Sequence, residues 1–313
     1  MITQAFVLGA GLGNRLRPLT EDLPKPLVPV FGKPLITFAF DHLIAAGIDS
    51  FVVNTHHLPE RWDDSLGRKS YRGCPLRLVH EPILLETGGG IKNAEPFLTA
   101  ETFIVYSGDV LTDLPLEPLI EAHFRAGNDV TLALRSTGVA SQVAFRDGRI
   151  ADIAGRLGHP GNYDHANVSI WNRNAFARFK SGEKISYVPV LVDWIAAGGR
   201  IGGIVIEEGR WFNLTSPRDY LELHRVVATE NWRPAFPLGE PWPVPIAPDA
   251  TIDPQAKVIG FSCVGAGCII GAQAGIEDSI LWPGSQIAPC ARLKRCIVRT
   301  DRHVEGEQRD AII

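Results

Sequence analysis

The sequence lacks the features of several large protein classes. No apolar run approaches the roughly 20 residues that a transmembrane helix needs, and no basic stretch precedes an apolar one at the N-terminus. The five cysteines are an odd number without C-x-x-C spacing, so neither a disulfide framework nor a cysteine zinc site is expected. The net charge of −4 gives no reason to expect nucleic acid or an anionic membrane as a partner. We therefore expect a cytoplasmic protein that binds neither.

The first two thirds of the chain alternate short β-rich runs with helical ones. With 313 residues and 45% hydrophobic content, the chain can bury a substantial core and form one or two domains. Strands are predicted at 5–8, 51–54, 76–80, 102–107, 130–134, 168–171 and 201–206, and helices at 35–46, 59–66, 90–98 and 116–126. An added β-hairpin is predicted at 145–150, centred on Asp147-Gly148. This alternation predicts an α/β fold with a mixed, mainly parallel sheet that helices cover.

The last third of the chain has a different period. Residues 233–248 carry six prolines and read as a linker, because proline ends helices and is excluded from sheet interiors. Beyond it, an aliphatic residue recurs every six positions, which predicts a left-handed parallel β-helix with that residue inside. The spacing is carried by Ile246, Ile252, Val258, Val264, Ile270 and Ile276 and, after a break at 277–286, by Ile287 and Leu293.

These patterns divide the chain into three parts. We predict an α/β domain at 1–232, which the resemblance described below implies to be catalytic, a Pro-rich linker at 233–248 and a β-helix at 249–313. The four cysteines in the last part are expected to be small interior or corner residues of the coils. The flat faces of a β-helix can pack against copies of themselves, so a homo-oligomer is possible.

A glycine-rich turn follows the first predicted strand, in the stretch "AFVLGAGLGNRLRPLTEDLPKPL". The Rossmann fingerprint requires G-x-G-x-x-G, but here Asn14 stands in place of the third glycine, and the second strand ends without a carboxylate. No G-x-x-x-x-G-K-[ST] motif occurs, which excludes a P-loop. The backbone N–H groups of such a turn can still approach a phosphate closely. Arg15 and Lys25, the latter between two prolines that we expect to hold it extended, favour a polyphosphate ligand.

The motif G-x-G-x-R-x-x-P-L-T followed by P-K-P-L resembles the signature of the sugar-phosphate nucleotidyltransferases. The resemblance covers nearly the whole chain, since many members carry a hexapeptide-repeat β-helix after the catalytic domain. Gly9 stands where the family usually has alanine. The resemblance implies transfer of a nucleotidyl group from an NTP to a sugar 1-phosphate, with release of pyrophosphate and with Arg15 and Lys25 as catalytic residues. The nucleotide-binding residues that it predicts are Gly9, Ala10, Gly11, Gly13, Glu81, Gly88, Gly89 and Asp109.

A magnesium site is predicted from two further motifs. Asp109 ends a strand, where a carboxylate faces the ligand crevice of such a sheet, and it matches the family's metal-binding G-D pair. The family's second ligand comes from W-x-D-x-G-T-P, which here reads "WFNLTSP" with Asn213 in place of the aspartate. An amide oxygen can coordinate Mg²⁺ but lacks the charge, so we expect weaker metal binding. A regulatory or scaffold role without catalysis is therefore an alternative.

The sugar site is predicted from the stretch "DHANVSIW", with Asn167 as the first candidate and Asp164 behind it. No equivalent of the family's E-K-P lysine is found. The motifs "LLETGGGI" and "SGDVLTD" are most similar to those of the N-acetylmuramate-1-phosphate uridylyltransferases of cell-wall recycling, which favours UTP. Mannose- or heptose-1-phosphate guanylyltransferases are the alternative. A hexapeptide acyltransferase would need a catalytic histidine on a coil, and His303 is the only C-terminal candidate.

Overall fold

The computed structural model describes residues 2–67, 69–138 and 141–313. The four positions outside these ranges all fall within the predicted catalytic domain, 1–232. The chain forms two compact units that do not follow the order of the sequence. The first comprises Met1–Gly11, Phe38–Trp211 and Ala235–Pro237, and the second comprises Leu12–Thr37, Phe212–Pro234 and Leu238–Ile313. The segment after Gly11, which carries Arg15 and Lys25, therefore belongs to the same unit as the C-terminal repeats.

A ten-stranded sheet forms the centre of the first unit, in the order β10-β11-β13-β9-β12-β7-β1-β4-β6-β5. Its strands are β1 (Gln4–Leu8), β4 (Ser50–Thr55), β5 (Ser70–Tyr71), β6 (Cys74–His80), β7 (Thr102–Ser107), β9 (Val130–Arg135), β10 (Val143–Arg146), β11 (Arg149–Ile153), β12 (Asp164–Asn172) and β13 (Ile201–Val205). All seven predicted strands are present, and the predicted hairpin is the pair β10–β11, turning at Asp147 and Gly148 with positive φ at both.

The order of the sheet reverses at β1. This strand pairs in parallel with β4 on one side and with β7 on the other. At such a point, the loops that follow neighbouring strands diverge, and ligands of open α/β sheets bind at the carboxyl ends. The segments after β1 and β7 are therefore the positions where a ligand is expected to bind. The predicted mainly parallel α/β sheet is confirmed, with β12 as an antiparallel strand between β7 and β9.

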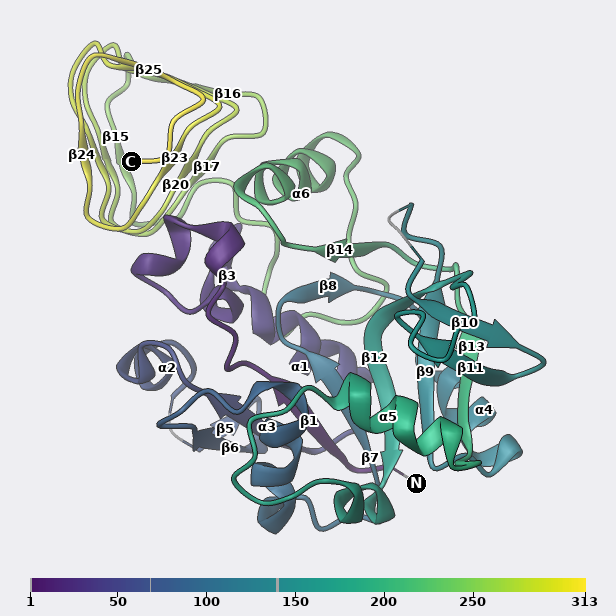
Figure 1. Cartoon of the computed structure of the whole chain (residues 1–313). Helices are drawn as coiled ribbons and strands as arrows, with labels where there is room; N and C mark the ends of the chain where they lie inside the picture. The colour runs from purple at the N-terminus through teal and green to yellow at the C-terminus, as the bar shows by residue number, and fades with distance from the viewer. Residues whose placement is uncertain (1, 68, 139–140) are drawn as a thin grey trace. The chain divides into compact units, whose positions relative to one another are not determined.

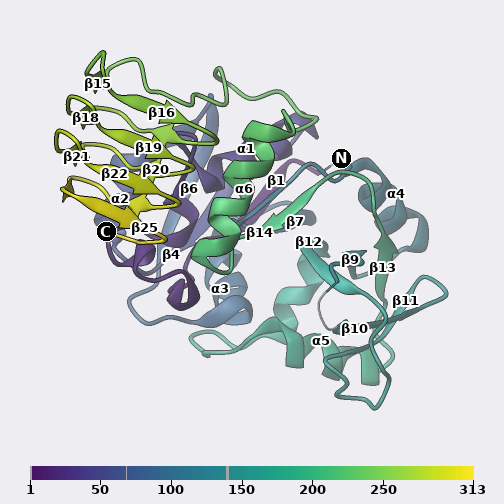
Figure 2. The same ribbon diagram turned by 90° about the horizontal axis from the view of Figure 1, so that it is seen from above.

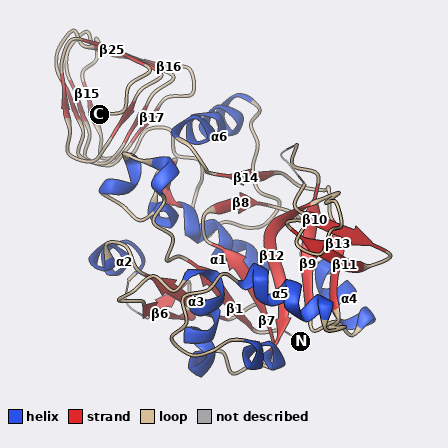
Figure 3. Ribbon diagram, viewed as in Figure 1, coloured by secondary structure: helices blue, strands red, loops and turns tan. Residues whose placement is uncertain are grey.

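Helices flank the strands of this sheet (Figure 3). The predicted helices correspond to α1 (Leu35–Ala45), α2 (Pro59–Leu66), α3 (Glu86–Ala94) and α4 (Glu117–Ala126). The start predicted for α3 at Gly90 is wrong, because the helix begins at Glu86. The sequence analysis missed α5 (Tyr187–Ala196) and α6 (Pro217–Thr229). Each follows a serine, Ser186 or Ser216, whose side chain caps the first turn, and this capping pattern was the signal available in the sequence.

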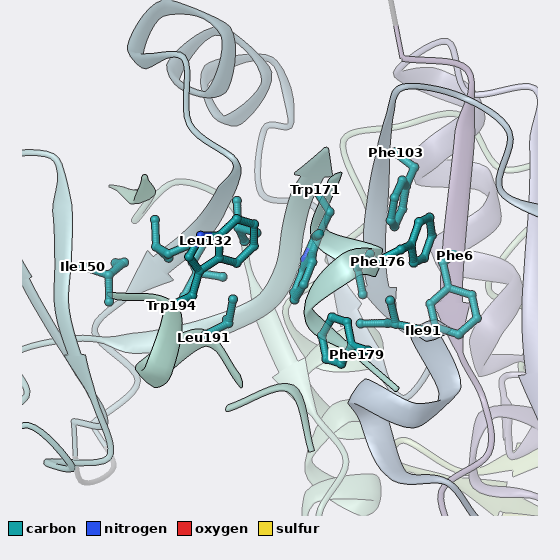
Figure 4. Close-up of a cluster of buried hydrophobic side chains, with 14 of the residues drawn as sticks. Phe6, Ile91, Phe103, Leu132, Ile150, Trp171, Phe176, Phe179, Leu191 and Trp194 are labelled. Atoms are coloured by element: carbon teal, nitrogen blue, oxygen red, sulfur yellow. The ribbon is translucent and has the colours of Figure 1, made fainter. Parts of the chain in front are cut away.

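An aromatic cluster fills the core of the first unit (Figure 4). The rings of Phe103 on β7 and Phe176 are stacked with centroids 5.4 Å apart. Trp171 on β12 lies 6.2 Å from Phe179, and both side chains are buried. Close packing of this kind leaves few alternative positions for the strands that carry the side chains. It therefore fixes β7 and β12, whose ends bear predicted site residues.

Most of the second unit is a parallel β-helix, confirming the predicted class of the C-terminal region. Three sheets run along it, in the orders β15-β18-β21-β24, β16-β19-β22-β25 and β17-β20-β23. The strands are β15 (Thr251–Ile252), β16 (Lys257–Ile259), β17 (Cys263–Val264), β18 (Ile269–Ile270), β19 (Gly275–Glu277), β20 (Ile280–Leu281), β21 (Gln286–Ile287), β22 (Arg292–Lys294), β23 (Ile297–Val298), β24 (His303–Val304) and β25 (Glu307–Arg309). Figure 1 looks into the coils, and Figure 2 shows them stacked.

The expected break in the six-residue spacing at 277–286 corresponds to a change in the length of the turn, and the coil continues through it. Ile252 pairs with Ile270, Ile270 with Ile287 and Ile287 with Val304, so one turn of 18 residues is followed by turns of 17. The stretch that breaks the period is β20 and its flanks, with Leu281 buried on Val264. The parallel pairing of the coils is continuous across this change in turn length.

One side chain departs from the predicted inward pattern. Ile246 precedes the first full coil and is 45% exposed, since no coil covers it. The cysteines of the repeats fit the predicted interior or corner positions, since Cys290 is exposed at a turn with positive φ and the other three are buried. All five cysteines are free thiols. No helix in the described part of the chain is long and apolar enough to cross a membrane.

Candidate active site

The turn after β1 contains two glycines with different surroundings. The backbone N–H of Gly9 donates to Oδ1 of Asn54 at 2.9 Å. A Cβ at Gly9 would lie 2.6 Å from the Trp62 ring and 2.7 Å from the carbonyl oxygen of Asn54, so alanine would clash there. A Cβ at the exposed Gly11 would meet nothing within 4 Å. Packing within the protein therefore explains Gly9, while Gly11 leaves backbone open to a ligand, and the neighbouring Ala10 is buried.

Glu81 lies in the interior of the first unit. Its side chain is fully buried, and Oε1 accepts from Nδ2 of Asn54 at 2.8 Å while Oε2 accepts from the backbone N–H of Leu85 at 2.9 Å. Asn54 in turn accepts from Gly9. Both carboxylate oxygens, predicted to lie near a nucleobase, are thus engaged with the protein. Glu81 links the turn after β1 to the start of α3, which makes it a positioning residue in this structure.

The glycines that follow Glu81 are part of a helix. We call residues 81–94 the second glycine segment. Gly88 and Gly89 were expected in a loop ahead of a helix, but they lie in the first turns of α3 and both donate to the carbonyl oxygen of Ile185. A Cβ at Gly89 would lie 2.3 Å from the carbonyl oxygen of Glu183, and one at Gly90 would lie 2.8 Å from Oε1 of Glu81. Close packing inside the unit therefore requires glycine here.

Asp109 follows β7, next to the turn after β1. The register pairs Leu8 with Ser107, and the N–H of Gly108 donates to the carbonyl oxygen of Leu8 at 2.9 Å. The Ser107 hydroxyl donates to Oδ1 of Asp109 at 2.8 Å, and the Asp109 side chain is half-buried. The structure therefore brings Asp109 and Gly9 together at the reversal point of the sheet.

Asn167 occupies a bulge near the start of β12. The register of β12 against β9 shifts between His165 and Ser169, and Asn167 has a φ of +63°. Because Val168 pairs with Tyr106 in antiparallel sense, this bulge lies at the same edge of the sheet as the end of β7. Asp164 instead accepts from the Thr137 hydroxyl at 2.6 Å and from the N–H of Gln142 at 3.2 Å, which holds a neighbouring segment.

A partly buried histidine beside Asn167 was missed by the sequence analysis. The Nε2 atom of His165 lies 3.2 Å from the carbonyl oxygen of Val168, and Nδ1 lies 3.2 Å from the Tyr187 hydroxyl. Burial lowers the pKa of His165 to about 4, so the ring is neutral near pH 7. Since a carbonyl only accepts, Nε2 carries the proton and Nδ1 accepts from Tyr187. The histidine within "DHANVSIW" was the only signal for this pair.

The second unit contains the part of the G-x-G-x-R-x-x-P-L-T and P-K-P-L signature that follows Gly11. Gly13 has a φ of +63°, and its carbonyl oxygen accepts from the N–H of Leu16 at 2.9 Å and from the Thr20 hydroxyl at 3.0 Å. Arg15 is exposed within the short helix η1 (Asn14–Leu16). The two hydrogen bonds close a turn that presents the Arg15 guanidinium to solvent.

Lys25 differs from its expected conformation. It begins the short helix η3 (Lys25–Leu27), so its backbone is not extended as its two prolines suggested. Pro24 alone is extended, with ψ of 140°, and Pro26 fits the second position of the helix. Lys25 is only 8% exposed, and a Cβ at Gly13 would lie 3.1 Å from that of Lys25. Gly13 thus allows the turn to pack directly on the lysine.

Asn213, the predicted second metal ligand, is also in the second unit. Its Oδ1 atom is buried and has no hydrogen-bond partner within the described ranges. The residues after it cap α6: Asp219 accepts from the N–H of Thr215 at 3.1 Å, and its own N–H donates to Ser216 at 3.2 Å. No group of three or more His, Cys, Asp or Glu among the described residues could hold a metal ion.

The His303 side chain lies on the surface of the β-helix. It is 55% exposed, and Nε2 lies 3.0 Å from Oε1 of Glu305. An exposed surface histidine of this kind provides no enclosed acceptor site.

Comparisons with known proteins agree on one family. The sequence profile described as Nucleotidyl transferase matches residues 4–145. The chain is 34% identical over 228 residues to an N-acetylmuramate alpha-1-phosphate uridylyltransferase of Caulobacter vibrioides, covering 68% of this chain and 92% of that one. It is 29% identical over 294 residues to a mannose-1-phosphate guanylyltransferase of Mycobacterium tuberculosis, covering 90% and 80%.

Solved structures give the same fold. The inositol-1-phosphate CTP transferase from T. maritima superposes with a TM-score of 0.57 at 21% identity, covering 72% of this chain and 97% of that chain. At this identity the likeness supports the fold of the sheet-containing region and not its substrate.

Proposed function

Because the chain belongs to the sugar-phosphate nucleotidyltransferase family and is an enzyme of the sugar-1-phosphate nucleotidyltransferase type, we propose that it transfers a uridylyl group from UTP to N-acetylmuramate 1-phosphate or a similar sugar 1-phosphate. The products are the nucleoside diphosphate sugar and pyrophosphate. One observation carries this proposal: the open turn at Gly11 and the carboxylate of Asp109 follow the adjacent strands β1 and β7. Ligands of such sheets bind at these strand ends.

The proposed chemistry needs no protein nucleophile. The sugar-phosphate oxygen attacks the α-phosphorus of the NTP in line, and pyrophosphate leaves, so catalysis consists of positioning and charge neutralisation. We assign Arg15, which is exposed, to the departing β- and γ-phosphates. We assign the 8% exposed Lys25 to the α-phosphate and the sugar phosphate, where its poor hydration strengthens the interaction with developing charge.

Magnesium is part of this proposal. Mg²⁺ binds through one or two carboxylates together with substrate phosphates, and Asp109 supplies a half-buried carboxylate. The buried Oδ1 of Asn213, without a hydrogen-bond partner in the described chain, fits a ligand of an ion or an acceptor from its water. When bound, the ion would screen the repulsion between the two phosphate groups. Asn167, at the bulge of β12, is our candidate for contact with the sugar.

A second substrate pair follows from the comparison with the M. tuberculosis enzyme. That mannose-1-phosphate guanylyltransferase aligns with 90% of this chain, a larger share than the 68% of the uridylyltransferase from Caulobacter vibrioides. GTP with mannose 1-phosphate is therefore the second candidate.

A matrix assay of pyrophosphate release tests these proposals. UTP, GTP, CTP and dTTP are each combined with N-acetylmuramate, mannose, heptose and glucose 1-phosphates, with Mg²⁺ and with EDTA. We expect the highest kcat/KM with UTP and N-acetylmuramate 1-phosphate, and loss of release in EDTA. A preference for GTP and mannose 1-phosphate would replace the first pair by the second. No release with any pair would contradict catalysis and favour a regulatory role.

A further inference from the structure

The β-helix contacts the signature residues through Arg299. The Arg299 guanidinium donates from Nη1 to the carbonyl oxygen of Pro18 at 3.1 Å, to Oε2 of Glu21 at 3.1 Å and to Oδ2 of Asp22 at 2.9 Å. Its side chain is 12% exposed, while those of Glu21 and Asp22 are 53% and 31% exposed. An arginine reaching out from a β-helix coil to two carboxylates of a distant segment is an ion-pair network, not an isolated surface pair.

The final coil holds Arg299 in place. Its backbone N–H donates to the carbonyl oxygen of Ile313 at 2.9 Å, and its own carbonyl oxygen accepts from the Ser285 hydroxyl at 3.1 Å. Arg302 adds a second cation, 3.7 Å from Oδ2 of Asp22. The guanidinium is therefore presented by a fixed backbone, and it loses less rotamer freedom on pairing than a mobile arginine would.

Further hydrogen bonds connect the residues that Arg299 contacts to the turn at residues 13–16, which we call the phosphate-binding turn. Glu21 belongs to the short helix η2 (Leu19–Glu21), as does Thr20, whose hydroxyl donates to the carbonyl oxygen of Gly13. That carbonyl oxygen also closes the turn around Arg15 by accepting from Leu16. Three consecutive contacts thus connect the last coil to the turn that carries Arg15.

A second contact supports the residues after Lys25. The Trp282 indole N–H donates to the Tyr220 hydroxyl at 3.0 Å, and that hydroxyl donates to the carbonyl oxygen of Pro29. Trp282 and Tyr220 are both fully buried. The β-helix therefore holds both ends of the segment from Pro18 to Pro29.

We propose that Arg299 is a positioning residue for the reaction, through which the β-helix orders the phosphate-binding turn and neutralises Glu21 and Asp22. The segment must attract a polyphosphate, yet it carries these two carboxylates a few residues from Arg15 and Lys25. Unneutralised, they repel the phosphates. The inference rests on the proposed function, because it assumes that the turn binds an NTP.

Arg299→Gln tests the proposal in the full-length chain. We expect the KM for the NTP to rise by about tenfold, with kcat changed by less than about threefold, because the lost charge acts on binding of the phosphates. Arg295→Gln is the matched control, since Arg295 pairs with Asp310 on the same β-helix. That variant is expected to keep the wild-type KM.

Removing the carboxylates separates neutralisation from simple structural support. Arg299→Gln combined with Glu21→Gln and Asp22→Asn should restore the KM to within about threefold of the wild-type value. A KM defect in the single variant that the triple variant does not reduce would overturn the assignment of this effect to neutralisation of Glu21 and Asp22. A wild-type KM in Arg299→Gln would overturn it as well.

Amide hydrogen exchange without ligand distinguishes this proposal from the proposed function. Amides of residues 13–27 should exchange faster in Arg299→Gln than in the wild type and in Arg295→Gln. If the wild-type chain releases no pyrophosphate with any substrate pair, the proposed function fails, while the exchange rates still decide whether Arg299 orders the turn. Unchanged exchange in Arg299→Gln would contradict the positioning role.

Discussion

The signature segment, residues 9–27, and the second glycine segment, residues 81–94, look alike in sequence but are held differently. In the second glycine segment, Gly89 and Gly90 are surrounded by protein atoms at distances too short for a Cβ. In the signature segment Gly9 is packed in the same way, but Gly11 faces open space and Arg15 is exposed. The first arrangement makes glycine a packing requirement, whereas the second leaves backbone and cations available to a ligand. Glycine-rich composition alone does not distinguish these two uses.

Lys25→Met is expected to have the largest effect on activity, because Lys25 lies in the signature segment, where we propose that the phosphates react. We expect kcat to fall by about 10²–10³-fold, as when other groups that stabilise transition-state charge are removed. Steady-state pyrophosphate release measures this effect. Thermal unfolding and NTP binding serve as controls, since methionine retains most of the buried stem of Lys25. A kcat within threefold of the wild-type value would contradict a catalytic role for this lysine.

A pair of alanine variants tests the difference between the two segments directly. At Gly89 a Cβ would lie 2.3 Å from a carbonyl oxygen, so Gly89→Ala should lower the free energy of unfolding by about 1–3 kcal/mol. Gly11→Ala meets no atom within 4 Å and should change stability by less than about 0.5 kcal/mol, while weakening NTP binding. Urea unfolding and calorimetric titration with NTP give both quantities. Equal destabilisation of the two variants would remove the distinction.

The sequence predicted the strands better than the surroundings of individual site residues. Alternating β-rich runs located β1 and β7, so the positions of Gly11 and Asp109 at strand ends followed from local pattern. The full burial of Glu81 did not, because it depends on Asn54 and Leu85, which reach it only through the fold. The sequence of a glycine-rich motif does not show whether its carboxylate binds a ligand or accepts a hydrogen bond from a backbone N–H.

In the β-helix too, local sequence patterns predicted the fold but not a contact between residues far apart in the chain. Its six-residue period was readable, because each coil repeats a local requirement for one inward aliphatic residue. The contact from Arg299 to Asp22 joins residues 277 positions apart, and no local pattern marks it. The repeats were therefore predictable as a fold but not as a support for the signature segment.

The smallest expected effect is on the pH dependence of the free energy of unfolding, through a histidine of the second unit. His224 is fully buried in α6; its Nε2 accepts from the N–H of Phe31 at 3.3 Å, and its Nδ1 donates to the carbonyl oxygen of Tyr220. Burial lowers the pKa of His224 to about 4, against 6.5 for the ordinary side chain. Between these values the unfolded chain binds the additional proton, so stability falls as pH drops from 6.5 toward 4.

His224→Gln should remove this contribution from the pH dependence. Between pH 7.5 and 5.5, we expect the loss of unfolding free energy to be smaller than in the wild type by about 1 kcal/mol. Urea unfolding at both pH values measures the difference, and His159→Gln, at an exposed position, should keep the wild-type slope. The same slope in His224→Gln as in the wild type would mean that His224 takes up its proton equally in both states. In that case proton uptake by His224 would not be coupled to folding, and the bond from the Phe31 N–H to its ring would not make the stability of the second unit depend on pH.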